Sequence, residues 1–362
     1  MPNSPDPQPH GQAGAALAEA HGGPLPSHYS SVAEEYDALT QGAALLDRSS
    51  IGRLSLTGED ALDLLNRLST NDLMGLRENT GILTVLTSNK GRIMDLLFVL
   101  RRADGLLALT APENRQKVAD WIDFYTFTED VTIQDMTEET AMLSVAGPRG
   151  ASFLDRVSGA DVSSLGRYDS IHVRVGGVET TLIRTDLAQL PAFDLVVAAA
   201  DGQRLREELL NEGEGLGVKQ VGMEALEVAR VELGVPAYGK ELSEDFNPLE
   251  ANLLEYISFT KGCYVGQEVV ARLNTYNKVQ RQLVGLRWDS DSSAAPGSKL
   301  LLEGKQVGLV TSAAWSPRLD KVLGLGYVKT AQTQAGTVLS MNVGDGEVPV
   351  EVVAQPGKTH QT

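Results

Sequence analysis

The chain has 362 residues, a formal net charge of −17 and a single cysteine, Cys263. One cysteine excludes a disulfide within the chain, a zinc site made of thiolates, and an iron–sulfur cluster held by the cysteines of one chain. The acidic charge disfavours nucleic acid and anionic membranes as partners, and no apolar run approaches the roughly 18 residues that a membrane span needs.

The placement of the histidines narrows the enzyme classes further. Four of the five histidines lie near the ends of the chain, and only His172 lies in its body. A histidine-based triad needs a histidine beside its nucleophile, and catalytic zinc sites usually need two or three. The sequence therefore disfavours classical hydrolases and zinc enzymes and predicts no metal site. His172 lies in the alternating run IHVRV, which predicts a strand residue that faces solvent.

Residues 1–30 are rich in Pro, Gly, Ala and His, and we expect them to form a disordered leader. They contain no apolar segment of the kind that marks a secretory signal, and a chain without disulfides fits a reducing compartment, so we expect a cytoplasmic protein. A helix is predicted from Ser31 through residue 46, because Ser31 and Glu34 have the spacing of a capping box.

Two α+β parts are predicted after the leader, over residues 31–140 and 141–280. In the first, the pattern predicts a strand, an amphipathic helix, a hairpin, a third strand and a second helix, at residues 51–58, 58–70, 81–102, 105–111 and 113–125. In the second, it predicts a strand, a short helix, three strands and a helix, which end at residue 213. The repeated strand–strand–helix pattern favours an α+β body with mostly antiparallel sheets.

Residues 281–355 have a different character. Short apolar runs alternate with Gly, Pro, Asp and Ser, which predicts a small antiparallel β-barrel followed by a frayed tail. The chain has neither a GxGxxG that follows a strand and opens a helix nor a GxxxxGK[ST] run, so dinucleotide-binding and P-loop folds are disfavoured.

The segment KGCYVGQEVVAR, residues 261–272, contains the densest chemistry in the chain. Two glycines bracket a tight turn, and a helix is predicted to start near Gly266. Cys263 lies just before that helix start, where unpaired N–H groups favour a thiolate, and Lys261 adds positive charge. Gln267 and Glu268 fall in the first helical turn. The alternative is a small buried cysteine with ordinary turn glycines, which lone cysteines often are.

The eight residues Lys261, Gly262, Cys263, Tyr264, Val265, Gly266, Gln267 and Glu268 resemble the signature of the YgfZ family of folate-binding proteins. Upstream, VARVELGVPAYGKEL and NPLEANLLEYISFTKG are similar to glycine cleavage T-proteins, as are LLNRLSTNDL, LTSNKGRIMDLL and SPRLDKVLGLGYV. The resemblance covers about residues 32–353. T-proteins lack a cysteine in the signature, which favours the YgfZ branch.

The resemblance implies a three-domain ring with tetrahydrofolate or a related folate bound at its centre. It places Asp95, Asp194, Arg230 and Tyr238 at the folate site, with Asp95 and Cys263 as candidate catalytic residues. From the strand position alone, Asp95 is expected to point out of the sheet into solvent, unless it meets a partner such as a pterin amine.

Several positions depart from the T-protein pattern. T-proteins have two adjacent acids where this chain has Asp95 followed by Leu96, and they have an arginine where it has Leu226. Asp194 aligns with a folate-binding glutamate but is shorter, and an ordinary edge-strand acid is an equal alternative. Arg230 matches a family arginine, although it fits a structural ion pair equally well.

Residues 261–287 carry a local excess of positive charge. They contain five cations, Lys261, Arg272, Lys278, Arg281 and Arg287, and one acid, Glu268. Such a strip could hold a polyglutamate tail, a protein partner or RNA, or it could be a solvated face.

Three functions follow as hypotheses. The first is a folate-dependent helper of iron–sulfur proteins, the role that YgfZ-type proteins have in cluster assembly and tRNA modification. The second is an aminomethyltransferase that moves a one-carbon unit from a lipoyl-bound aminomethyl group to tetrahydrofolate. The third is a non-catalytic scaffold with a vestigial folate pocket.

Overall fold

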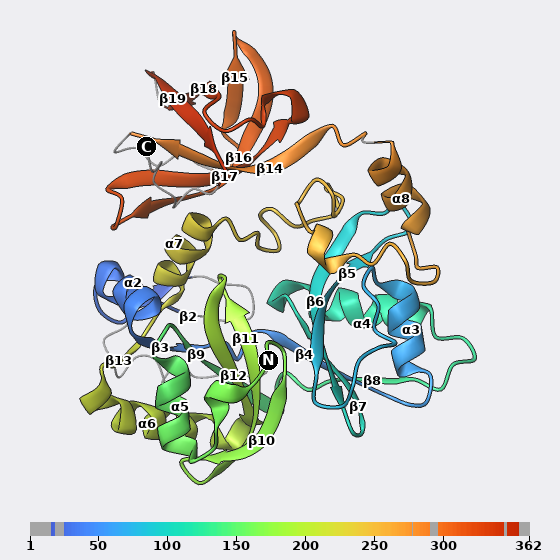
Figure 1. The fold of residues 1–362 in the computed structure, drawn as a ribbon, viewed down its shortest axis with the longest axis vertical. Coiled ribbons are helices and arrows are strands. Elements are labelled where there is room, and N and C mark those ends of the chain that lie inside the picture. The colour runs from blue at the N-terminus through green and yellow to red at the C-terminus, as the bar shows by residue number, and fades with distance from the viewer. Residues whose placement is uncertain (1–15, 19–24, 277, 290–295, 344–345, 355–362) are drawn as a thin grey trace, which may run out of the picture.

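The computed structural model describes residues 16–18, 25–276, 278–289, 296–343 and 346–354. They form two open sheets, each covered by helices, and a closed barrel. In Figure 1 the barrel lies at the top, the six-stranded sheet at the lower left and the five-stranded sheet at the right. All strand pairs but one are antiparallel, which confirms the predicted α+β class with a C-terminal barrel. No helix in these residues is long and apolar enough to cross a membrane.

The five-stranded sheet has the order β5-β6-β7-β4-β8 and carries α3 and α4 on one face. Its strands are β4 (Gly52–Thr57), β5 (Gly81–Thr87), β6 (Ile93–Arg102), β7 (Gly105–Thr110) and β8 (Thr132–Asp135), and its helices are α3 (Ala61–Leu68), η1 (Pro112–Asn114) and α4 (Arg115–Phe124). The apolar face predicted for α3 is buried against the sheet, as is the inner face of α4.

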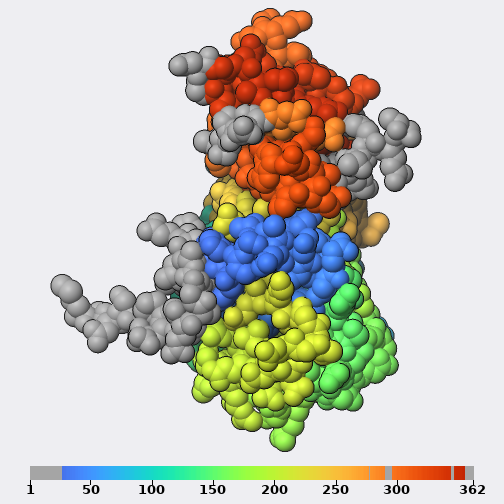
Figure 2. Space-filling model, turned by 90° about the vertical axis from the view of Figure 1, so that its left-hand side faces the viewer, coloured from blue at the N-terminus to red at the C-terminus, as the bar shows by residue number. Residues whose placement is uncertain are grey.

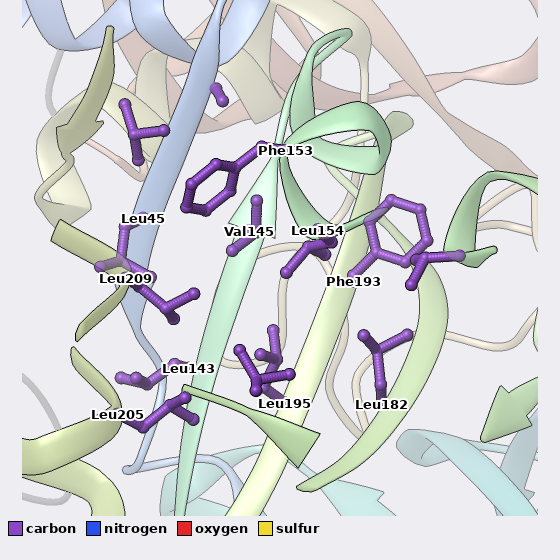
Figure 3. Packing of buried hydrophobic residues seen from close by; sticks show 14 of the residues in the cluster. Leu45, Leu143, Val145, Phe153, Leu154, Leu182, Phe193, Leu195, Leu205 and Leu209 are labelled. Atoms are coloured by element: carbon purple, nitrogen blue, oxygen red, sulfur yellow. The ribbon is translucent and has the colours of Figure 1, made fainter. Parts of the chain in front are cut away.

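The six-stranded sheet has the order β10-β11-β12-β9-β3-β13, with β3 and β13 as its parallel pair. Its strands are β3 (Ala43–Asp47), β9 (Thr140–Ala146), β10 (Ser170–Val175), β11 (Val178–Leu187), β12 (Leu190–Ala198) and β13 (Val218–Gln220). One face packs on α5 (Gly150–Ser158) and α6 (Ala199–Gly213). Figure 3 shows this core, in which Phe153 and Leu154 of α5 meet Val145 and Phe193 of the sheet.

The other face of this sheet meets two different neighbours. Part of it packs on α2 (Val32–Gln41) and α7 (Met223–Leu233), and part of it packs on the five-stranded sheet through Met142, Ile183 and Phe98. Figure 2 shows α2, in blue, between the orange barrel and the yellow-green residues of α6.

The barrel closes in the order β14-β17-β16-β15-β18-β19 around its own apolar core. Its strands are β14 (Arg281–Trp288), β15 (Lys299–Leu302), β16 (Lys305–Ser316), β17 (Lys321–Lys329), β18 (Val338–Val343) and β19 (Gly346–Val353), with η5 (Thr330–Gln332) after β17. Three further short 3-10 helices are η2 (Val162–Ser164), η3 (Glu214–Leu216) and η4 (Leu254–Tyr256), and α8 (Gln267–Thr275) leads into the barrel.

Two expectations differ from the structure near the N-terminus. The predicted helix ends at Gln41 rather than at residue 46, because Gly42 stops it and β3 begins at Ala43; the Ser31 hydroxyl caps it as expected. Within the expected leader, β1 (Ala16–Ala18) pairs with β2 (Leu25–His28), so this part is ordered. The expectation for residues 1–15 and 19–24 lies outside the described residues.

Sheet membership also departs from the predicted boundary at residue 140. β3 precedes the whole five-stranded sheet in the sequence, yet it pairs with β9 and β13. The five-stranded sheet is therefore a continuous insertion between two neighbouring strands of the six-stranded sheet.

Candidate functional site

The KGCYVGQE segment is a loop that is tied to the five-stranded part. Lys261 is half-buried, and its Nζ donates to the backbone oxygens of Asn66, Ser69 and Asn71, at the C-terminal end of α3. Burial lowers the pKa of Lys261 to about 8. All three ammonium protons are thus used to cap α3. The positive charge of Lys261, which we expected to favour the thiolate of Cys263, is instead bound at the end of α3.

The second glycine of the segment is required by packing. Gly266 has φ +83°, and a Cβ there would lie 2.4 Å from the Ser88 oxygen and 2.9 Å from the backbone of Gly91. Gly91 is the turn residue of the β5–β6 hairpin and has φ +63°. The hairpin tip therefore rests directly on the start of α8, which begins at Gln267 as predicted.

The rest of the segment presents the thiol to solvent. Tyr264 is buried, Val265 N–H donates to the Arg67 oxygen at 2.9 Å, and the Thr87 hydroxyl donates to the Val265 oxygen at 2.6 Å. Cys263 is exposed and free. The anchored neighbours fix the loop, so the cysteine is displayed from a rigid support and is not a core residue. The described residues contain no group of His, Cys, Asp and Glu suited to a metal ion.

Asp95 does not point into solvent, and the expectation of an outward side chain was wrong. It is 2% exposed, and its carboxylate accepts hydrogen bonds from the Thr110 hydroxyl, the Ala111 N–H at 3.1 Å and the Leu96 N–H at 2.8 Å. Burial raises its pKa to about 6, and hydrogen bonds from Thr110, Ala111 and Asn114 act in the opposite direction. Asp95 therefore fixes the junction between β7 and η1.

The next residue, Leu96, lies opposite Val85 in the sheet. It packs against an apolar cluster that lies between the five-stranded sheet, the loops after α7 and the barrel. Tyr238 and Tyr256 are half-buried against the same cluster. A carboxylate at position 96 would face this junction, whereas Asp95 contacts β7 and η1. Of the two positions at which T-proteins carry adjacent acids, the one that faces this junction is therefore apolar in this chain.

Tyr238 lies close enough to Asp95 to feel the charge of its carboxylate. Lys117, whose ammonium pairs with Glu244, lies close enough to Tyr238 to influence its pKa. Burial raises the pKa of Tyr238; Lys117 lowers it and the Asp95 carboxylate raises it. Asp95 and Tyr238 therefore share one electrostatic environment.

Asp194 lies on an interior strand, so the alternative of an ordinary edge-strand acid does not apply. It is buried on β12, pairs with Arg48 at 3.1 Å, and accepts hydrogen bonds from the hydroxyls of Ser144 and Thr185. The side chain faces away from α5 and α6, on the face of the sheet that meets the rest of the molecule.

Arg230 is the centre of a buried network. Its five N–H donors all meet acceptors in the chain: both oxygens of Glu227 at 2.6 Å, the Val235 oxygen and Glu241 at 3.0 Å, and the Ser312 hydroxyl at 2.6 Å. Ser312 belongs to β16, so Arg230 joins α7 to the barrel. No donor remains for a ligand, which favours the structural alternative for this residue.

Tyr168 was missed by sequence reasoning. It has φ +71°, an uncommon conformation for a bulky residue, and its hydroxyl is buried with no partner among the described residues. Its N–H donates to the Arg184 oxygen, next to Thr185, and its ring meets that of Phe98 edge-on at 5.5 Å. The run GRYDS offers no periodicity or motif that would have revealed it. Tyr168 thus lies where the two open sheets meet, near the surroundings of Asp194.

The site residues form two groups. In the first group, Tyr238 and Tyr256 pack against the cluster that contains Leu96, with Asp95 next to it in the chain, while Tyr168 and Asp194 lie where the two open sheets meet. Cys263 has no described contact with any of them and lies on the loop beside α3 and α8. Two cavities, of about 370 and 180 Å³, lie elsewhere, one on the barrel beside Leu301 and Val338 and one beside Arg156 and Glu208.

The predicted basic strip is weaker than its composition suggested. Lys261 caps α3, Arg281 pairs with Glu250, and Arg287 pairs with Glu351. Arg272 and Lys278 remain exposed on α8 and just after it. His172 is exposed on β10, as predicted.

Known proteins resemble this chain over almost its whole length. The family model for the GCVT N-terminal domain matches residues 8–261, and that for the glycine cleavage T-protein C-terminal barrel domain matches residues 281–357. A protein of Desulfitobacterium hafniense named aminomethyltransferase is 29% identical over 346 residues, 95% of this chain and 94% of the relative. One of Thermotoga neapolitana with the same name is 29% identical, over 96% of this chain and 95% of the relative.

The fold has a matching solved structure. The glycine cleavage system aminomethyltransferase T from Bartonella henselae superposes with a TM-score of 0.87 over 96% of both chains, at 22% identity. Its fold, with mixed helices and strands and a terminal barrel, is the fold found here. By the order and extent of both matched domains, this chain belongs to the glycine cleavage T-protein family.

Proposed function

We propose that this protein binds tetrahydrofolate, or a related folate, at the junction of its three parts, and that it supports iron–sulfur proteins in the manner of the YgfZ branch. The observation that carries the proposal is that Cys263 is exposed on an anchored loop. Within KGCYVGQE, Lys261, Tyr264 and Gly266 are all used to hold the loop, and the thiol is left exposed.

The residues at the junction suit a flat ligand with polar edges. Leu96, Tyr238 and Tyr256 are half-buried and offer apolar and aromatic surface, while the buried Tyr168 hydroxyl has no partner in the described part of the chain. Asp194 is a buried carboxylate of the kind that accepts hydrogen bonds from an amino-substituted ring. Bound folate would supply a one-carbon carrier there, and this chain's residues would bind and orient it.

Leu96 argues against aminomethyl transfer. In the T-proteins that the sequence resembles, two adjacent acids stand where this chain has Asp95 and Leu96, and one of them assists the reaction. Here both oxygens of Asp95 accept hydrogen bonds from its own sheet and from the start of η1, and the inner position is hydrocarbon. Proton transfer to a reacting group needs a side chain within hydrogen-bond reach of it, which Leu96 cannot supply.

Aminomethyltransferase activity is the second candidate, because the relatives at 28–29% identity bear that name. The favouring observation is Asp95 itself, whose pKa of about 6 would let it exchange a proton near neutral pH beside Tyr238. Release of ammonia from an aminomethylated lipoyl carrier, in the presence of tetrahydrofolate, would support this candidate; no turnover would exclude it.

Two measurements test the proposal. Calorimetric titration with tetrahydrofolate should show saturable binding to the wild type, weaker binding to Asp194→Asn, and unchanged binding to Cys263→Ala. If the wild type does not bind tetrahydrofolate, the hypothesis of a non-catalytic scaffold is the one that remains. In cells that lack their own copy, Cys263→Ala should fail to restore iron–sulfur enzyme activity, while Gly262→Ala, its matched neighbour with open space around it, should restore it. Full restoration by Cys263→Ala would refute the role of the thiol.

A further inference from the structure

An aromatic cluster lies at the end of α4, away from the residues discussed so far. Trp121 stacks on Phe124 with ring centroids 6.2 Å apart, and Phe124 meets Tyr125 at 5.2 Å and Phe127 at 6.5 Å. Trp121 and Tyr125 pack against the core under α3 and α4. Phe124 and Phe127 are 63% and 78% exposed. Two adjoining phenyl rings therefore stand in solvent on a half-buried aromatic base.

The turn that contains Phe127 is held by hydrogen bonds. Glu129 accepts hydrogen bonds from the N–H groups of Phe127 and Thr128, at 2.9 and 3.0 Å, and from Arg67 of α3 at 2.9 Å. Asp130 N–H donates to Asp60 at 2.8 Å, which ties the same turn to the start of α3. The backbone that carries the exposed ring is thus held before any partner arrives, which lowers the entropic cost of binding.

The surroundings of the two rings are acidic. Residues 120–130 contain four acids, Asp120, Asp123, Glu129 and Asp130, and no Lys or Arg. Across the turn, residues 59–63 contain three more acids, and the neighbouring cation, Arg67, is already paired with Asp63 and Glu129. A negative rim around exposed phenyl rings repels anionic lipid, nucleic acid and a second copy of this chain, whose net charge is −17.

We infer that Phe124 and Phe127 form a docking surface for a basic, amphipathic segment of another protein. Apolar side chains of the segment cover the two rings, while its lysines or arginines meet the acidic rim and stack on the ring faces. Aromatic residues that become buried at the centre of an interface contribute much of its binding energy, and Phe124 and Phe127 are exposed enough to be buried in this way. The two rings belong neither to the proposed folate site nor to the Cys263 loop.

A synthetic amphipathic helix of Leu and Lys serves as the probe, measured by fluorescence anisotropy at physiological salt. The wild type should bind it, and Phe124→Ser with Phe127→Ser should weaken binding about tenfold or more. Both side chains are exposed, so the melting temperature of this variant should stay unchanged. The matched control is Tyr276→Ser, which removes an aromatic ring that is 64% exposed on another surface and should leave the affinity as it was.

Other outcomes overturn the inference. Equal affinity of the double variant would mean that net charge alone attracts the probe, and absence of wild-type binding would remove the surface altogether. Equal binding of a Leu and Glu helix would refute the charge argument. Sedimentation that shows a wild-type dimer, lost in the double variant, would assign the rings to a second copy, and ring-dependent binding to anionic vesicles would assign them to a membrane.

Discussion

Replacing Gly266 by alanine perturbs the contact between the hairpin tip and the start of α8. The new Cβ would lie 2.4 Å from the Ser88 oxygen and 2.9 Å from the backbone of Gly91. These are main-chain atoms, so they cannot rotate away as a flexible side chain would. Crowding of this kind costs about 1–3 kcal/mol, and the left-handed φ of +83° costs alanine about 1–2 kcal/mol more. We expect a loss of roughly 2–4 kcal/mol, because alanine recovers some chain entropy.

Gly262→Ala is the matched control, four residues earlier in the same segment. A Cβ at Gly262 would meet no atom within 4 Å, so its effect should stay within about 0.5 kcal/mol. Urea denaturation followed by tryptophan fluorescence gives both free energies of unfolding. If the two variants lose equal stability, the hairpin does not press on α8 and the support assigned to the Cys263 loop is wrong.

Three further substitutions test other parts of the structure. Lys261→Met should lose about 1–3 kcal/mol, since three backbone oxygens at the end of α3 lose their donor, whereas Lys261→Arg should lose less; thermal melts compare the two. Arg230→Met should lose about 3–5 kcal/mol in urea denaturation, because it leaves the buried Glu241 carboxylate without its cation; a loss under 1 kcal/mol would contradict the network. For Asp95, burial raises the pKa from 3.8 to about 6, so the folded state holds the proton more tightly than the unfolded chain. The stability that comes from this proton is present below about pH 4 and is lost as the pH rises to about 6, by roughly 3 kcal/mol. As the pH rises between these values, the free energy of unfolding of Asp95→Asn should therefore increase relative to that of the wild type by that amount. If the free energies of unfolding of both proteins depend on pH in the same way, the buried placement of Asp95 is refuted.

Local patterns predicted much of the fold. The face of α3 was predicted from its spacing, because a helix buries one stripe whatever sheet lies beneath it. The start of α8 was predicted near Gly266, and the hairpin predicted over residues 81–102 turns at Gly91; both glycines have a positive φ in the structure. These features depend on residues close together in the chain.

The features that the sequence did not predict depend on contacts between residues far apart in the chain. Asp95 was expected to face solvent, but the register between β5 and β6 shifts beside it, and its donors arrive fifteen and sixteen residues later. The partners of Arg230 include Ser312, 82 residues away, and those of Lys261 lie at the end of α3. A local sequence pattern does not contain both ends of such contacts, so the surroundings of these residues could not be predicted from it.

The insertion of the five-stranded sheet into the six-stranded one affects the order in which the nascent chain can fold. β3 leaves the ribosome before the whole of residues 52–135, yet its partners are β9 and β13, at residues 140–146 and 218–220. The inserted sheet is complete in itself and can form during synthesis. The apolar run of β3 must wait, unpaired, until about 100 further residues have been made, and its second edge must wait for about 170; it is a natural binding site for a chaperone in that interval.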